Sequence, residues 1–189
     1  HTKAMDLLRF VPVTHRFRLP AEDIDYLAPT SLDRTLAKHQ VQLADHRRQA
    51  ILVLASPGAA DASLQRYARR PGGHWRQVGT PWKASVGRAG LGLGRGVTSP
   101  IRTQLHPKRE GDGKAPAGVF ELGTGFGALE KPYDGEWPWR RADARDRWVD
   151  DPESPHYNSW QTAEPNTDWS SAEVLSNYDI GLVVEHNTP

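Results

Sequence analysis

The sequence contains no cysteine. Disulfide bonds and zinc sites with thiolate ligands are therefore excluded, and so is a cysteine nucleophile within these 189 residues. Because proteins without disulfides occur on both sides of a membrane, the absence of cysteine does not indicate a compartment.

The chain also has almost no net charge and no long apolar run. The chain has 24 basic and 23 acidic side chains, for a formal net charge of +1, so we expect no strongly basic groove and no nucleic-acid partner. No apolar stretch approaches the roughly 18 residues that cross a bilayer, and the first residues lack the pattern of a secretory signal. We therefore expect no membrane span.

The first 49 residues are expected to form an arm followed by a helix, ahead of one domain over residues 50–189. Residues 1–28 show no sustained hydrophobic period, which is typical of an arm. A helix is predicted from Thr30 or Ser31 to about Arg48, because the pattern puts four residues on one face. These are Leu32, Leu36, His39 and Leu43.

The remaining chain favours a mainly β fold. A buried strand is predicted over residues 50–55, and a half-buried strand over 63–68 leads through the turn 70–73 into a hairpin. Further strands are predicted over 82–86, 119–122 and 180–186. The last of these is rich in valine, so we expect it to be a central strand with Val183 and Val184 inaccessible.

Glycine is concentrated in two segments. Residues 87–96 carry five glycines, at alternate positions from Gly90 onward. Alternation removes the side chains from one face of an extended segment and allows another backbone to lie against it. Lys108–Gly118 combines five charged residues with three glycines and Pro116, which is typical of a shaped loop rather than a linker. We expect a glycine-only backbone angle or a close approach at Gly118.

Other site chemistries are weakly supported. The glycine segment does not fit GxGxxG, no P-loop motif or GxSxG elbow is present, and no histidine pair has zinc-binding spacing, so neither a cofactor nor a metal is expected. Glu110 with Asp112, or Asp150 with Asp151, could form the carboxylate pair of a glycosidase, but solvated carboxylates are the commoner reason for such a pattern.

The stretch 124–177 is rich in tryptophan and proline, and two interpretations of it stay open. Its aromatic side chains could form a wall that stacks on carbohydrate or binds a peptide. They could equally form a small core that holds a long segment in place.

Several motifs together resemble the L,D-transpeptidase (YkuD-type) catalytic domain, from about Ile51 to Pro189. They occur in the family's order and spacing: residues 86–92, 108–120, 148–152 with 156–158, 168–173 and 181–188. The resemblance implies a β-sandwich-like domain of the cell envelope, periplasmic or extracellular, in which a cysteine transfers acyl groups between peptidoglycan stem peptides. It also implies a cleft near six residues, which are Lys108, Asp112, Gly118, Tyr157, His186 and Asn187.

In that family the catalytic histidine and cysteine follow the segment that matches Val183–Thr188. We therefore expect an incomplete domain that is inactive in this chain, with a sheet edge that a partner chain could cover. The alternative hypothesis is a non-catalytic domain that binds cell wall or protein through the Trp-rich segment.

Overall fold

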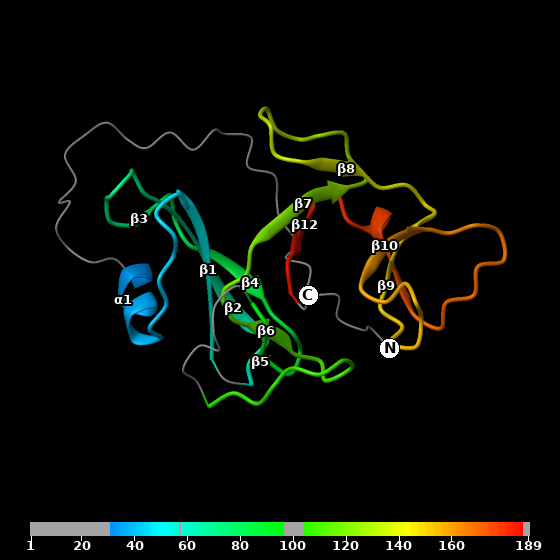
Figure 1. Cartoon of the computed structure of the whole chain (residues 1–189), viewed down its shortest axis with the longest axis horizontal. Coiled ribbons are helices and arrows are strands. Elements are labelled where there is room, and N and C mark those ends of the chain that lie inside the picture. Colours follow the sequence, from blue (N-terminus) through cyan, green and yellow to red (C-terminus); the bar gives the residue numbers. More distant parts are fainter. Residues whose placement is uncertain (1–30, 57, 97–103, 187–189) are drawn as a thin grey trace. The chain divides into compact units, whose positions relative to one another are not determined.

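The computed structural model describes residues 31–56, 58–96 and 104–186 (Figure 1). Twelve short strands, one α-helix and one 3-10 helix lie in this part, which confirms the mainly β class. The chain divides into two compact units, described separately below. Unit 1 is Phe120–Glu185, and unit 2 contains the described residues from 31 to 119 together with His186. The predicted arm and Asn187 lie outside the described residues.

A four-stranded antiparallel sheet forms the centre of unit 2. Its strands are β1 (Gln49–Ala55), β2 (Asp61–Ala68), β3 (Arg76–Gln77) and β4 (Trp82–Ser85), and β2 pairs with each of the other three. The predicted hairpin is confirmed. Its turn is closed by the Gly73 amide, which donates to the Arg70 carbonyl over 3.0 Å, and Gly72 follows Pro71 with a φ of 67°.

Helix α1 (Ser31–Lys38) is ten residues shorter than predicted. Gln40 has a φ of 55°, and the Val41 amide donates to the Leu36 carbonyl over 2.8 Å. This arrangement is a Schellman motif, which ends a helix although no glycine is present. The hydrophobic pattern of the sequence continues past Lys38 because Leu43 packs on the same core as Leu32 and Leu36. Leu43 reaches that core from irregular chain and not from a helix.

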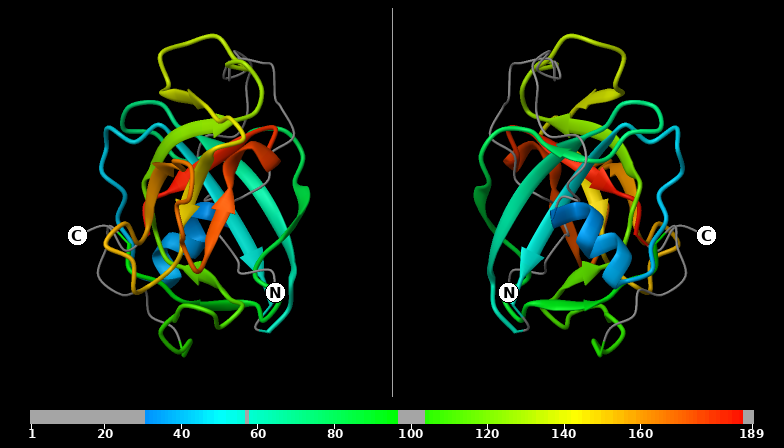
Figure 2. Two further views of the ribbon diagram at one scale, coloured as in Figure 1. Left: turned by 90° about the vertical axis from the view of Figure 1, so that its right-hand side faces the viewer. Right: turned by 90° about the vertical axis from the view of Figure 1, so that its left-hand side faces the viewer.

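The core of unit 2 lies between α1 and the β1–β2 hairpin, which lie beside each other in Figure 2. Leu32, Tyr67 and Trp75 are buried there, and Ala50 and Leu52 of β1 pack against them. The prediction that β1 is fully buried is wrong, because β1 is an edge strand of this sheet and Leu54 is 41% exposed.

Unit 2 is completed by two strands from the glycine-rich segments. Strand β5 (Leu91–Leu93) pairs in parallel with β6 (Ala115–Ala117). The strand predicted over 119–122 is displaced: residues 115–117 pair as β6, and the next strand begins only at Leu122. Pro116 is tolerated within β6 because the ribbon has only two strands, so a residue that lacks an amide donor can face away from the pairing.

Unit 1 contains two three-stranded sheets. One has the order β12-β7-β8, made from Gly181–Val184, Leu122–Gly127 and Trp139–Arg141. The other has the order β10-β9-β11, made from Ser159–Thr162, Asp146–Val149 and Ala172–Val174. The 3-10 helix η1 (Leu175–Asn177) follows β11. The long Trp-rich stretch therefore carries regular elements of its own.

Some tryptophans of unit 1 support the small-core interpretation of that stretch, and one supports the ligand-binding interpretation. Trp148 and Trp160 pack against the core formed by Phe126, Ala142, Leu175 and Tyr178, as the small-core interpretation predicts. Trp137 is 45% exposed, and its indole N–H donates to the Gly123 carbonyl over 3.0 Å. Only part of the aromatic set is thus available for stacking on a ligand.

The prediction of a central strand before His186 is wrong. Strand β12 pairs with β7 alone among the described strands, so it lies at the edge of its sheet, and Val183 and Val184 are only half-buried. A short valine-rich run cannot distinguish a central from an edge strand, because one covered face is enough to select apolar residues.

Candidate functional site

The two glycine-rich segments pack directly against each other. The Ala89 amide donates to the Gly113 carbonyl over 2.8 Å, and the Ala115 amide donates to the Gly90 carbonyl over 2.9 Å. A Cβ atom built on Gly87 would lie 2.5 Å from the Ala115 nitrogen. Glycine is therefore required at position 87 for the contact between the backbones, in line with the close approach predicted for this glycine-rich segment.

Asp112 holds the turn of the Lys108–Gly118 loop together. Its carboxylate accepts from the Arg109 amide over 2.8 Å and from the Lys114 amide over 2.9 Å. Burial raises the pKa of Asp112, but these two amides and the Lys108 ammonium outweigh burial and leave the pKa below its ordinary value. Asp112 is therefore ionised at neutral pH and keeps the loop in one shape.

Lys108 lies beneath this loop rather than in solvent. Its side chain is 8% exposed, and its ammonium lies 3.4 Å from Asp112 Oδ1 and donates to the Arg109 carbonyl over 3.2 Å. The absence of a side chain at Gly92 makes room for it, because a Cβ there would lie 3.1 Å from Lys108 Cα. The ion pair with Asp112 therefore fixes the position of the Lys108 side chain under the loop.

His186 belongs to the same unit as the loop. Its Nδ1 lies 3.3 Å from the Arg95 amide nitrogen and 3.2 Å from the Arg95 carbonyl oxygen. Burial lowers the pKa of His186 below its ordinary value, and the nearby charges of Lys108 and Arg95 lower it further. The hydrogen bond with the Arg95 backbone and the charge of Glu110 oppose this shift but do not outweigh it. A neutral imidazole at pH 7 can both donate and accept a hydrogen bond.

The structure places the six residues predicted to line a cleft in different parts of the molecule. Lys108, Asp112 and His186 form one electrostatically coupled group in unit 2. Gly118 is exposed and has no left-handed φ; within its loop those angles belong to Gly111 and Gly113 instead, so the predicted glycine-only angle at Gly118 is wrong. The alternative, a close approach at Gly118, stays a prediction. Tyr157 is an exposed residue of unit 1, and Asn187 lies outside the described residues.

The acidic pair of the loop does not have the environment of a glycosidase pair. The Asp112 oxygens accept from loop amides, and Glu110 Oε1 accepts from the Gly111 amide over 3.2 Å. Both carboxylates therefore shape the turn. In the described ranges, no group of three or more histidine, aspartate or glutamate side chains is placed to hold a metal ion.

No family model, curated protein or solved structure matched this chain. Within the described residues, no helix has the length and apolarity needed to cross a membrane. Any functional assignment therefore has to come from the residues and their geometry.

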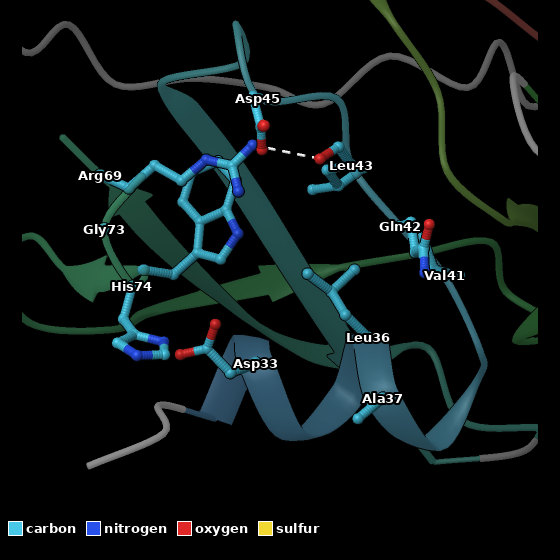
Figure 3. A pocket seen from close by; sticks show the side chains of 11 residues that line it. Asp33, Leu36, Ala37, Val41, Gln42, Leu43, Asp45, Arg69, Gly73 and His74 are labelled. Carbon is cyan, nitrogen blue, oxygen red and sulfur yellow. Dashed lines mark hydrogen bonds between the residues drawn. The ribbon is translucent and has the colours of Figure 1, made fainter. Parts of the chain in front are cut away.

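Sequence reasoning missed a pocket of about 410 Å³ in unit 2, shown in Figure 3. It lies between α1, the irregular residues 41–45 and the segment Gly73–Trp75. A helix that continued to Arg48, as predicted, would have kept residues 41–45 from forming this wall. No clear signal of this wall is present in the sequence, because residues 41–45 contain no glycine or proline to indicate a break in the helix.

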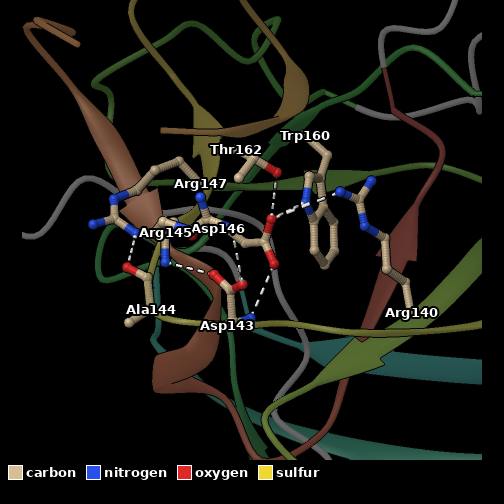
Figure 4. A network of polar contacts seen from close by, with 8 residues as sticks. All are labelled: Arg140, Asp143, Ala144, Arg145, Asp146, Arg147, Trp160 and Thr162. Atoms are coloured by element: carbon tan, nitrogen blue, oxygen red, sulfur yellow. Dashed lines mark hydrogen bonds and ion pairs between the residues drawn. The ribbon is translucent and has the colours of Figure 1, made fainter. Parts of the chain in front are cut away.

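Sequence reasoning also missed a buried polar network in unit 1, centred on Asp146 and drawn in Figure 4. Asp146 is 6% exposed and accepts from Trp160 Nε1 over 2.9 Å and from Thr162 Oγ1 over 2.8 Å. The Asp143 amide donates to its other oxygen, and the Arg140 guanidinium stacks 4.0 Å from the centre of the Trp160 ring. Every hydrogen-bond donor to the Asp146 carboxylate comes from the folded unit itself, so we infer that the network stabilises the fold of unit 1.

Proposed function

We propose that this chain supplies the larger part of an L,D-transpeptidase catalytic domain, β-sandwich-like in fold, that acts on peptidoglycan stem peptides in the cell envelope. The observation that carries the proposal is the ordered series of motifs from residue 86 to residue 188. Two of these motifs, the glycine segment and the Lys108–Gly118 loop, lie in direct backbone contact. This contact supports the proposal that both motifs contribute to one binding site.

The residues of unit 2 would act by binding and orienting the substrate. Lys108 and Arg95 supply positive charge beside His186, and His186 supplies a neutral hydrogen-bonding group. Stem peptides carry carboxylates and amides, which these groups can bind. The loop, fixed by Asp112, would hold the binding groups in place before substrate arrives.

The acyl transfer itself would need a group that these 189 residues do not contain. In the resembling family a cysteine thiolate forms a thioester with the donor peptide, and the chain has no cysteine. We therefore assign this chain the wall of the binding site and not the nucleophile.

A second function is favoured by one observation, the exposure of Trp137. In that alternative, unit 1 binds cell wall or protein through Trp137 together with the half-buried Tyr133 and Trp139, whose rings lie edge to face at 5.8 Å. No catalysis would be involved.

Titration of isotope-labelled protein with a soluble stem tetrapeptide, followed by amide NMR, tests the first proposal. We expect saturable shifts at Arg95, Lys108–Gly118 and His186. The substitution His186→Gln should weaken binding about fivefold, because one hydrogen bond to the ligand is altered. His46→Gln is the matched control, since His46 is an exposed histidine of the same unit.

Shifts confined to the surroundings of Trp137, with retention on sacculi lost in Trp137→Ala, would favour the second function instead. Equal affinity of the His186→Gln variant and the wild-type chain, or no saturable shift at millimolar peptide, would contradict the proposed site.

A further inference from the structure

The pocket of unit 2 has fixed walls. Arg69 donates from Nε to the Arg47 carbonyl over 2.8 Å and from its terminal nitrogen to the Ala44 carbonyl over 2.6 Å. The same guanidinium lies 4.5 Å from the centre of the Trp75 ring. Arg69 therefore ties the irregular segment after α1, which forms one side of the pocket, to the buried Trp75 on the other side.

The lining of the pocket is apolar in the middle and polar at the ends. Figure 3 shows Leu36 pointing from α1 into the centre, with Asp33 and His74 together at one end and Asp45 with Arg69 at the other. Its volume of about 410 Å³ falls within the range of about 300–1,000 Å³ that small-molecule sites occupy. A small ligand with an apolar body matches this arrangement.

The charges of the lining favour a positive ligand. Two carboxylates, Asp33 and Asp45, stand against one guanidinium. The Arg69 guanidinium donates hydrogen bonds to two backbone carbonyls and lies over the Trp75 ring, so it already has partners within the protein. A ligand in the pocket therefore meets the carboxylate of Asp45, while the Arg69 guanidinium in the lining is already engaged.

We propose that this pocket binds small amphipathic cations, namely ammonium compounds with an apolar chain. The apolar chain lies against Leu36 and the neighbouring aliphatic side chains, and the ammonium group is held by a carboxylate at the end of the pocket. The site is independent of the loop that carries the proposed function, so either can fail without the other.

Hexylammonium is a suitable probe, with 1-hexanol and hexanoate as neutral and anionic counterparts of the same length. Amide NMR of the full chain should show saturable shifts in α1, in residues 41–45 and in Gly73–Trp75 with hexylammonium. We expect hexanol to bind at least threefold more weakly, and hexanoate more weakly still, because only the cation gains from the carboxylates.

Asp45→Asn should weaken hexylammonium binding about threefold, the effect of one exposed ion pair, and leave hexanol binding unchanged. Asp45 lies in irregular chain, so this variant tests the proposal even if Asp33→Asn weakens the first turn of α1. Asp61→Asn, an exposed aspartate of β2, is the control and should bind as the wild type does. Equal binding of hexanol and hexylammonium, an unchanged Asp45→Asn variant, or shifts outside the pocket would overturn the proposal.

Discussion

At the scale of single residues, two aspartates hold otherwise unsatisfied donors. Asp112 accepts from loop amides in unit 2, and Asp146 accepts from an indole, a hydroxyl and an amide in unit 1. Burial raises the pKa of each, but the donors and a nearby cation lower it by more, so both have a pKa below the ordinary value. Each therefore stabilises its unit through its ionised form.

Asp146→Asn should lower the free energy of unfolding by about 1–3 kcal/mol at pH 7, because an amide cannot accept from all three donors and its own NH₂ group is left buried. A carboxylate with a depressed pKa in the folded state contributes its stability above the unfolded pKa of about 3.9, and loses it as pH falls through the folded value. The difference between variant and wild type should therefore shrink below about pH 4. Urea unfolding across pH 3–7 measures it.

Asp134→Asn serves as the control for this prediction, because Asp134 is an exposed aspartate of the same unit. It should unfold with the wild type at every pH. A difference between Asp146→Asn and wild type that does not change with pH would mean that the ionised carboxylate is not what stabilises the network.

At the scale of elements, the positions of the glycines decide whether two segments can pack. Gly87 is buried, and a Cβ there would lie 2.5 Å from backbone atoms of Gly113, Lys114 and Ala115. Backbone atoms cannot move aside as the end of a side chain can. The contact between the glycine segment and the Lys108–Gly118 loop therefore depends on the absence of a side chain at Gly87.

Gly87→Ala should destabilise unit 2 by about 1–3 kcal/mol, the usual cost of forcing a methyl group into a packed site. Gly73→Ala is the matched control, because a Cβ at Gly73 would have its nearest contact at an ordinary 3.4 Å. Thermal unfolding of both variants provides the measurement. A melting temperature for Gly87→Ala equal to that of Gly73→Ala would show that the loop can move away from the glycine segment.

At the scale of the whole molecule, the chain consists of two units, each with its own core of a few aromatic and aliphatic residues. The group proposed to bind stem peptides lies in unit 2, while the exposed Trp137 that favours the alternative function lies in unit 1. The two functional hypotheses are therefore separable by experiment on one and the same protein.

The proposed division of labour predicts that carbapenems do not acylate this chain. Acylation in the resembling family requires a thiolate, and none of the 189 residues is a cysteine. Intact mass spectrometry after incubation with a carbapenem should show the mass of the unmodified protein, alongside a cysteine-containing L,D-transpeptidase domain as the positive control. An increase by the mass of one β-lactam would reveal a different nucleophile and contradict the site assignment.

The amino-acid sequence by itself determined the features that depend on local backbone chemistry. The β2–β3 hairpin was predictable because Pro71 and Gly72 favour one turn type, and the close packing of the glycine segment was predictable because alternate glycines leave one face bare. The mainly β class followed from short apolar runs bounded by turn residues.

Only the tertiary structure decided the features that depend on residues distant in sequence. Apolar periodicity continued beyond Lys38, yet α1 ends there, since Leu43 reaches the core from irregular chain. The valines of β12 gave no indication of its edge position, because pairing partners are chosen by the whole sheet. The pocket and the Asp146 network were likewise hidden, since each joins groups from several segments whose approach is set by packing and not by any local pattern.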